Sequence, residues 1–307
     1  MQLGVAIRSM GPQSQPATFL ACARAAEAAG FADLWIQDHI AIPPDDAEGS
    51  GGRYLDPLTA LAWLAGHTQH IGLGTGVLIV PYRPALPTAK AIATVQELSG
   101  GRLRLGVGVG WMEAEFRALG VPRAQRGRTT DETLAFWRRC FEGDTVAAHG
   151  QPFLFLPRPA RPPIYVGGFG EAALRRAVRF GDGWMPMTGE PAHLAPQIAR
   201  LRELAQQAGR PTPEVVAFTG FDPREPERAP ERVAALAELG VARIVAGTRY
   251  AGADDFARNA EFLATRVLPA LRKEADESRP TRSEASRPAR SEAKPSGDRK
   301  GRPSEGR

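Results

Sequence analysis

Asp38 and His39 form a carboxylate–imidazole pair suited to acid–base chemistry, at the end of the apolar run "LWIQDH" (34–39). A histidine side chain ordinarily titrates near neutral pH and can exchange protons there, and a neighbouring carboxylate can orient it. A structural hydrogen bond is the plainer interpretation of such a pair. Its place after a predicted strand, before the Gly- and Asp-rich segment 40–56, favours a functional role with that segment as a lid.

Two glycine-rich runs, 71–80 ("IGLGTGVLIV") and 103–110 ("LRLGVGVG"), place glycine at every second position. A dinucleotide-binding turn needs G-x-G-x-x-G leading directly into a helix, and neither run has that spacing. Alternate strand positions share one face. A flat ligand could therefore lie against the bare backbone, or small residues could simply alternate with large ones inside a barrel. The pattern leaves both interpretations open.

A third glycine cluster, "VGGFGEAAL" (166–174), joins a predicted strand to a predicted helix. Backbone N–H groups at the start of a helix have no intrahelical partner and can bind an anion. This turn therefore indicates a phosphate-binding site.

Strands and helices alternate through residues 1–272. We predict eight strands, at 3–8, 34–39, 71–80, 103–110, 164–168, 182–187, 214–221 and 242–247. We predict helices at 16–30, 56–68, within 83–101, and at 129–143, 171–181, 193–209, 230–240 and 254–273, with a hairpin at 145–156. Eight strand–helix units predict an α/β protein with the (β/α)₈ (TIM) barrel fold. Its chemistry is expected at the carboxyl ends of the strands.

Composition narrows the class of protein further. The chain has 43% hydrophobic residues, a formal net charge of +5 and two cysteines, Cys22 and Cys140, without a C-x-x-C motif. No signal peptide and no membrane-spanning run is expected, which predicts a cytoplasmic protein that binds neither membrane nor nucleic acid. His67 and His70 have a spacing that could hold a metal. A helix end, where a cation suits the helix dipole, explains them better, so we expect no metal site.

The segment 273–307 differs from the rest of the chain. It contains ten Lys or Arg and seven Asp or Glu, and so carries +3 of the net charge. The repeat "SRPTRSEA", "SRPARSEA" (278–293) has no aliphatic side chain larger than alanine. Such a segment cannot bury enough apolar surface to offset the entropy of ordering, so we expect a disordered basic tail.

Taken together, these motifs resemble the bacterial luciferase-like superfamily of flavin and deazaflavin oxidoreductases. The matching pieces are "AEAAGFADLWIQDH", "GLGTGVLIVPYRPALPTAKAIATVQELSGGRLRLGVGVGW", "RGRTTDE" and "PPIYVGGFGEAALRRAVRFGDGWMPM". The resemblance implies a barrel that holds a tricyclic cofactor ring across its carboxyl face, with a bulge and a non-proline cis peptide at Gly76–Val77. It also implies a small-molecule substrate and a homodimer.

The resemblance further implies roles for individual residues. The Asp38–His39 pair is similar to that of members using the deazaflavin coenzyme F420, with the aspartate close to the ring and the histidine, as acid or base, on the substrate side. Thr75, Gly76 and Val77 would line the back of the ring. The phosphate would be held by Gly167, Gly168 and Gly170, with Arg126 or Arg128 as a helper. FMN is the alternative cofactor.

Two departures from the family pattern bear on the substrate and on the phosphate turn. Sugar-phosphate dehydrogenases of the superfamily have a tryptophan and a glutamate where this chain has Pro43 and Trp111, which argues against glucose-6-phosphate. The usual Ser or Asn of the phosphate turn is replaced by Phe169-Gly170. Glu113 and Glu115 follow Trp111 and could act as acid or base, but a solvated face is the expected place for them.

The sequence leaves three alternative functions. The first is an F420-dependent oxidoreductase that transfers a hydride between the deazaflavin and a small organic substrate. The second is an FMN-dependent luciferase-like monooxygenase. The third is a non-catalytic barrel that binds a ligand or a partner subunit.

Overall fold

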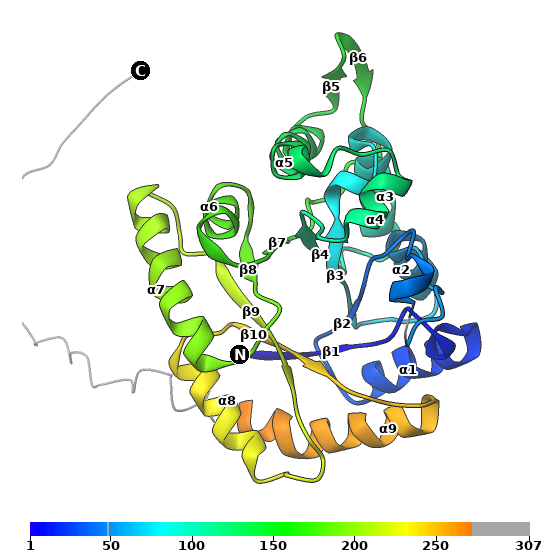
Figure 1. Cartoon of the computed structure of the whole chain (residues 1–307), viewed down its shortest axis with the longest axis vertical. Coiled ribbons are helices and arrows are strands. Elements are labelled where there is room, and N and C mark those ends of the chain that lie inside the picture. Colours follow the sequence, from blue (N-terminus) through cyan, green and yellow to red (C-terminus); the bar gives the residue numbers. More distant parts are fainter. Residues whose placement is uncertain (48, 272–307) are drawn as a thin grey trace, which may run out of the picture.

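Eight parallel strands close into a barrel in the order β1-β10-β9-β8-β7-β4-β3-β2 (Figure 1). The computed structural model describes residues 1–47 and 49–271, so the predicted tail at 273–307 lies outside the described residues. The strands are β1 (Gln2–Ala6), β2 (Asp33–Ile36), β3 (Gly72–Ile79), β4 (Leu103–Gly108), β7 (Ile164–Gly167), β8 (Gly183–Met185), β9 (Glu214–Gly220) and β10 (Arg243–Gly247). The predicted (β/α)₈ barrel is confirmed.

Helices cover the outside of the barrel and connect its parallel strands. They are α1 (Pro16–Ala28), α2 (Pro57–Ala65), α3 (Ala85–Leu98), α5 (Arg126–Glu142), α6 (Gly170–Phe180), α7 (Pro191–Gln207), α8 (Arg228–Glu238) and α9 (Ala253–Phe262). The predicted hairpin is also present, as β5 (Thr145–Ala148) and β6 (Gln151–Leu154), and it projects beyond α5 in Figure 1. A short helix that the sequence did not predict, α4 (Glu113–Ala118), follows β4. No helix within the described ranges is long and apolar enough to cross a membrane.

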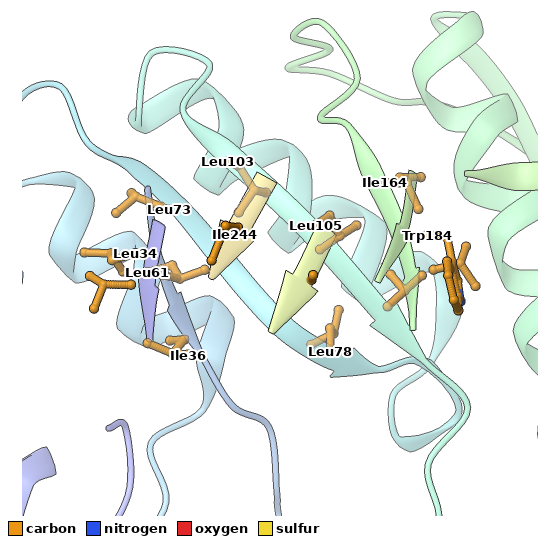
Figure 2. Packing of buried hydrophobic residues seen from close by; sticks show 14 of the residues in the cluster. Leu34, Ile36, Leu61, Leu73, Leu78, Leu103, Leu105, Ile164, Trp184 and Ile244 are labelled. Carbon is orange, nitrogen blue, oxygen red and sulfur yellow. The ribbon is translucent and has the colours of Figure 1, made fainter. Parts of the chain in front are cut away.

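The strands present two different faces. Leu34 and Ile36 of β2 belong to the large cluster of buried residues between strands and helices, part of which Figure 2 shows. Trp35, between them, belongs to a second cluster inside the barrel, with Tyr165 and Met185. Successive side chains of a strand point to opposite faces, and here both faces are buried. This explains why the strands appear in the sequence as continuous apolar runs.

Most strand glycines make room for large side chains inside the barrel. A Cβ on Gly74 would lie 2.4 Å from the indole of Trp35, and one on Gly72 would lie 2.9 Å from Cβ of Asp33. A Cβ on Gly106 would lie 2.1 Å from the carbonyl oxygen of Thr75. At these positions the packing interpretation is the correct one. Glycines nearer the carboxyl ends of the strands have a different environment.

Candidate active site

A cavity of about 320 Å³ opens at the carboxyl ends of five successive strands, β2, β3, β4, β7 and β8. The residues that line it are Gln37, Asp38, His39, Gly76, Val77, Ile79, Gly108, Val109, Gly110, Trp111, Gly167, Gly168 and Met187. The cavity thus brings together six of the residues expected at the site: Asp38, His39, Gly76, Val77, Gly167 and Gly168. Its position is the one at which TIM barrels carry their chemistry.

A bulge in β3 forms one wall of this cavity. Thr75 is paired with Leu105 of β4, and Leu78 is paired with Val107, so three steps along β3 match two along β4. The extra residue lets both Gly76 and Val77 line the cavity, although neighbours in a regular strand face opposite sides. The Gly76–Val77 peptide is cis, as the resemblance implied.

Two glycines on the neighbouring strands accommodate Val77. A Cβ on Gly108 of β4 would lie 2.6 Å from Cγ2 of Val77, and a Cβ on Gly167 of β7 would lie 2.9 Å from Cγ1. Such distances are too short for carbon atoms in contact, so glycine is needed at both positions. The bare backbone at the mouth therefore serves the bulge as well as any ligand.

His39 is held from outside the cavity by a buried glutamate. Its Nδ1 lies 2.8 Å from Oε2 of Glu115, which is 0% exposed. The other carboxylate oxygen, Oε1, accepts hydrogen bonds from the backbone N–H groups of Ile40 (2.6 Å) and Ala41 (2.9 Å). The hydroxyl of Tyr82 donates to Oε2 at 2.9 Å. Glu115 therefore orients the imidazole and leaves Nε2 as the ring nitrogen for a ligand in the cavity.

These contacts also set the charge of Glu115. Burial by itself would raise the pKa of the carboxyl, but the hydrogen bonds from Ala41, Ile40, His39 and Tyr82 together lower its pKa below the usual glutamate value. Burial, with the hydrogen bond to Glu115, raises the pKa of Tyr82. A carboxylate that accepts from Nδ1 fixes the tautomer with the proton on Nδ1.

The expectation that Glu115 lies on a solvated face is wrong. Of the two glutamates, Glu113 is exposed, whereas Glu115 packs on the buried side of α4. A pattern in the sequence could have shown this. Met112 lies three residues before Glu115 and Leu119 four residues after it, which places Glu115 on the apolar face of a helix.

Asp38 lines the cavity, but its carboxylate is bonded to protein groups at the end of β3. Its Oδ2 accepts from the backbone N–H of Ile79 (2.8 Å) and from Nη1 of Arg83 (2.6 Å), and its Oδ1 accepts from Nη2 of Arg83 (2.8 Å). Arg83 also binds Asp56, the N-cap of α2, at 2.8 Å. Because the carboxylate is paired in a two-point geometry and buried, Asp38 carries little net charge into the cavity.

The strand-to-helix turn at 167–170 has the backbone geometry of a tight glycine turn. Gly168 has φ of 114° and Gly170 has φ of 78°, both in the region that favours glycine. Trp184 Nε1 donates to the carbonyl oxygen of Gly168 at 2.8 Å. Gln197 Oε1 accepts from the N–H of Gly170 at 3.2 Å, so a phosphate would have to displace this side chain.

Three of the expected site residues do not line the cavity. Thr75 is buried and its hydroxyl donates to the carbonyl oxygen of Gly106 (2.7 Å), which ties β3 to β4 behind the bulge. Gly170 lies one turn further, at the start of α6. Arg128 is exposed on α5, where its guanidinium contacts Gln125 and Glu132, and Arg126 binds the carbonyl oxygen of Arg123. Neither arginine reaches the cavity lining.

The histidine pair considered for a metal lies elsewhere. Nδ1 of His67 is 2.8 Å from the carbonyl oxygen of Trp63, and the two rings are 4.5 Å apart. Within residues 1–47 and 49–271, no group of three or more His, Cys, Asp or Glu is arranged to hold a metal ion.

Comparison with known proteins places this barrel in a family. A family model described as luciferase-like monooxygenase matches residues 1–300, and the chain therefore belongs to that family, whose members are oxidoreductases or monooxygenases. An uncharacterized protein of Mycobacterium bovis is 33% identical over 252 residues, covering 75% of this chain and 85% of that protein. A 5,10-methylenetetrahydromethanopterin reductase of Methanolobus tindarius is 31% identical over 233 residues, covering 74% of this chain and 67% of that protein.

Two solved structures share the fold. An F420-dependent secondary alcohol dehydrogenase in complex with an F420–acetone adduct matches with a TM-score of 0.71 at 19% identity, covering 88% of this chain and 98% of that one. A riboflavin lyase with modified FMN and riboflavin matches with a TM-score of 0.71 at 15% identity, covering 90% and 92%. The fold thus holds a deazaflavin in one protein and a flavin in another.

Proposed function

We propose that this protein is an F420-dependent oxidoreductase that moves a hydride between the deazaflavin and a small organic substrate. The observation that carries the proposal is His39, oriented by a buried glutamate on the wall of a cavity that the Gly76–Val77 bulge of the neighbouring strand also lines. Membership of the luciferase-like family and the relationship to a methylenetetrahydromethanopterin reductase support it.

The shape of the cavity fits a flat ring. Its lining includes glycines at 76, 108, 110, 167 and 168, so much of its surface is backbone without side chains. Val77, Val109 and Ile79 supply apolar contacts, and these exclude water from the reacting atoms. When bound, the deazaflavin supplies a ring carbon, C5, that accepts or donates a hydride.

We assign the proton transfer to His39. In the oxidising direction, Nε2 accepts the proton that the substrate oxygen loses, and in the reducing direction it returns one. Glu115 holds the imidazole in the orientation and tautomer that this exchange requires. Asp38, with Arg83, fixes the end of β3 and therefore the position of the bulge. The backbone of Gly167 and Gly168, at the start of the turn into α6, would hold the phosphate of the cofactor.

Fluorescence titration of the purified protein with F420 and, separately, with FMN tests the proposal. We expect saturable binding of F420 at micromolar concentration and much weaker binding of FMN. Tight binding of FMN alone would replace the proposal with a flavin-dependent monooxygenase. Binding of neither cofactor would favour a barrel without redox activity.

A further inference from the structure

Four large apolar side chains are exposed around the mouth of the cavity. They are Ile40 (45% exposed), Trp111 (65%), Phe169 (51%) and Met187 (50%), and we call them the apolar rim. They follow β2, β4, β7 and β8, which lie on one continuous arc of the barrel with β3. Single exposed apolar residues are ordinary on protein surfaces, but a set gathered around one cavity marks a binding surface.

The rim is continuous with the site. Trp111 and Met187 line the cavity themselves, Ile40 follows His39 directly, and Phe169 follows Gly168. The indole of Trp111 stands edge-on to the imidazole of His39, with ring centroids 6.3 Å apart. Trp111 and His39 therefore lie side by side on the wall of the cavity.

The described side chains that line the cavity provide no cation for an acidic substrate. Among the described residues that line it, none is Lys or Arg, and the carboxylate of Asp38 is neutralised by Arg83. Glu115 lies behind His39 with both oxygens bonded to protein groups. Moving an unpaired charge from water into such a cavity is costly.

Resting on the proposed function, we propose that the substrate is an uncharged, mainly apolar molecule with one hydroxyl or carbonyl oxygen. That oxygen hydrogen-bonds to Nε2 of His39, and the apolar body of the molecule lies against the rim, with Trp111 as the main specificity-determining contact.

In the oxidising direction the C–H bond of the carbinol carbon breaks and its electron pair passes with the hydrogen to C5 of the oxidised deazaflavin. The hydroxyl proton passes to His39, and the C=O bond forms. Reduction reverses each transfer, so electrons and protons balance with the deazaflavin as the only redox partner.

Acetophenone and 4-acetylbenzoate form a matched pair of probes, because they differ only by one carboxylate. Isothermal titration of the protein saturated with F420 measures their binding directly, without turnover. We expect acetophenone to bind at least 30-fold more tightly. We expect Trp111→Ala to weaken acetophenone about tenfold and to leave the affinity for F420 within twofold.

Leu154→Ala is the matched control, since Leu154 is 70% exposed on β6 of the hairpin and does not line the cavity. It should change neither affinity. Equal or tighter binding of the carboxylate, binding of neither probe, or no effect of Trp111→Ala would overturn the proposal. The proposal would also be overturned if the wild type is a dimer that dissociates on Trp111→Ala. In that case the apolar rim would be covered by a second copy of the chain.

Failure of the proposed function is a separate result. The F420 titration on the same sample measures it, and the two probes can also be titrated into protein without cofactor. If the protein prefers acetophenone but does not bind F420, the proposed substrate class is supported and the proposed cofactor is contradicted.

Discussion

Nδ1 of His39 and Oε2 of Glu115 lie 2.8 Å apart, and this contact joins the end of β2 to helix α4 across 76 residues of sequence. The carboxylate is fully buried, whereas the histidine side chain is 17% exposed at the cavity. One residue thus meets the ligand while the other is shielded from it.

Glu115→Gln should lower turnover by about one to two orders of magnitude and leave F420 affinity nearly unchanged, because it removes the carboxylate that orients the imidazole and fixes its tautomer. Steady-state kinetics over a pH series, with a parallel cofactor titration, measure both quantities. Glu113→Gln on the exposed side of the same helix is the control and should behave as wild type. Equal losses in the two variants would contradict the assigned role.

The stability of the protein should depend on Glu115 at acid pH. Its folded-state pKa is lowered, so its contribution is present above the ordinary glutamate pKa of 4.5 and is lost as the pH falls toward the folded value. The difference in Tm between wild type and Glu115→Gln should therefore be largest above pH 4.5 and should shrink as the pH falls below it. A difference in Tm that is constant across this range would show that titration of Glu115 contributes nothing.

His39→Ala should reduce turnover by about 10²-fold or more, the usual contribution of a positioned acid–base group. Cofactor affinity should stay within a few-fold, because the proposed ring site consists of backbone and valine side chains. Stopped-flow measurement of the hydride-transfer step at saturating F420 checks the first expectation. His70→Ala at an exposed position controls for the loss of an imidazole. A large loss of affinity with normal turnover would instead make His39 a cofactor-binding residue.

Gly108→Ala should push Val77 toward the cavity and weaken F420 binding, since the new Cβ would lie 2.6 Å from Cγ2 of Val77. Overpacking of this kind typically costs about 1–3 kcal/mol. Val77→Ala in the same chain should restore much of the stability lost, and the double-mutant cycle should show a coupling above about 0.5 kcal/mol. Denaturant unfolding measures the cycle. Additive effects would mean that the two residues do not press on each other.

Arg83→Met should destabilise the protein by about 3 kcal/mol, because it leaves the buried carboxylate of Asp38 without its cation. The matched control is Arg224→Met, whose arginine is 88% exposed and pairs with Asp222, and it should change stability by less than about 0.5 kcal/mol. Urea unfolding of both variants tests the comparison. Similar values would show that the Asp38–Arg83 pair does not hold β3.

The barrel could be predicted because its signals are local. Runs such as 71–80 and 103–110 are buried on both faces, and helices as long as α3 and α5 show a clear apolar period, so both are visible in a short window of sequence. Helix α4 was missed because its six residues, Glu113–Ala118, are too few for a clear helical period after a long loop.

The candidate site could be predicted only in part. His39 and Gly168 were identified from their positions after strands, together with the family resemblance, and both line the cavity. The partners of the charged residues could not be derived, because Arg83 lies 45 residues from Asp38 and Glu115 lies 76 from His39. Local patterns cannot reveal which of several acidic residues reaches across such distances. The same limit left the glycine runs ambiguous until their neighbours were known.

Trp35, Tyr165 and Phe218 pack edge to face inside the barrel, with Phe218 against Gly76. These rings pack behind the described cavity, so a ligand of that cavity would enter and depart at the carboxyl ends of the strands. A cofactor ring lying on the bulge would sit deeper than a substrate held by the outer side chains. Turnover would then follow a compulsory sequence, in which the product dissociates before a fresh deazaflavin can replace the spent one.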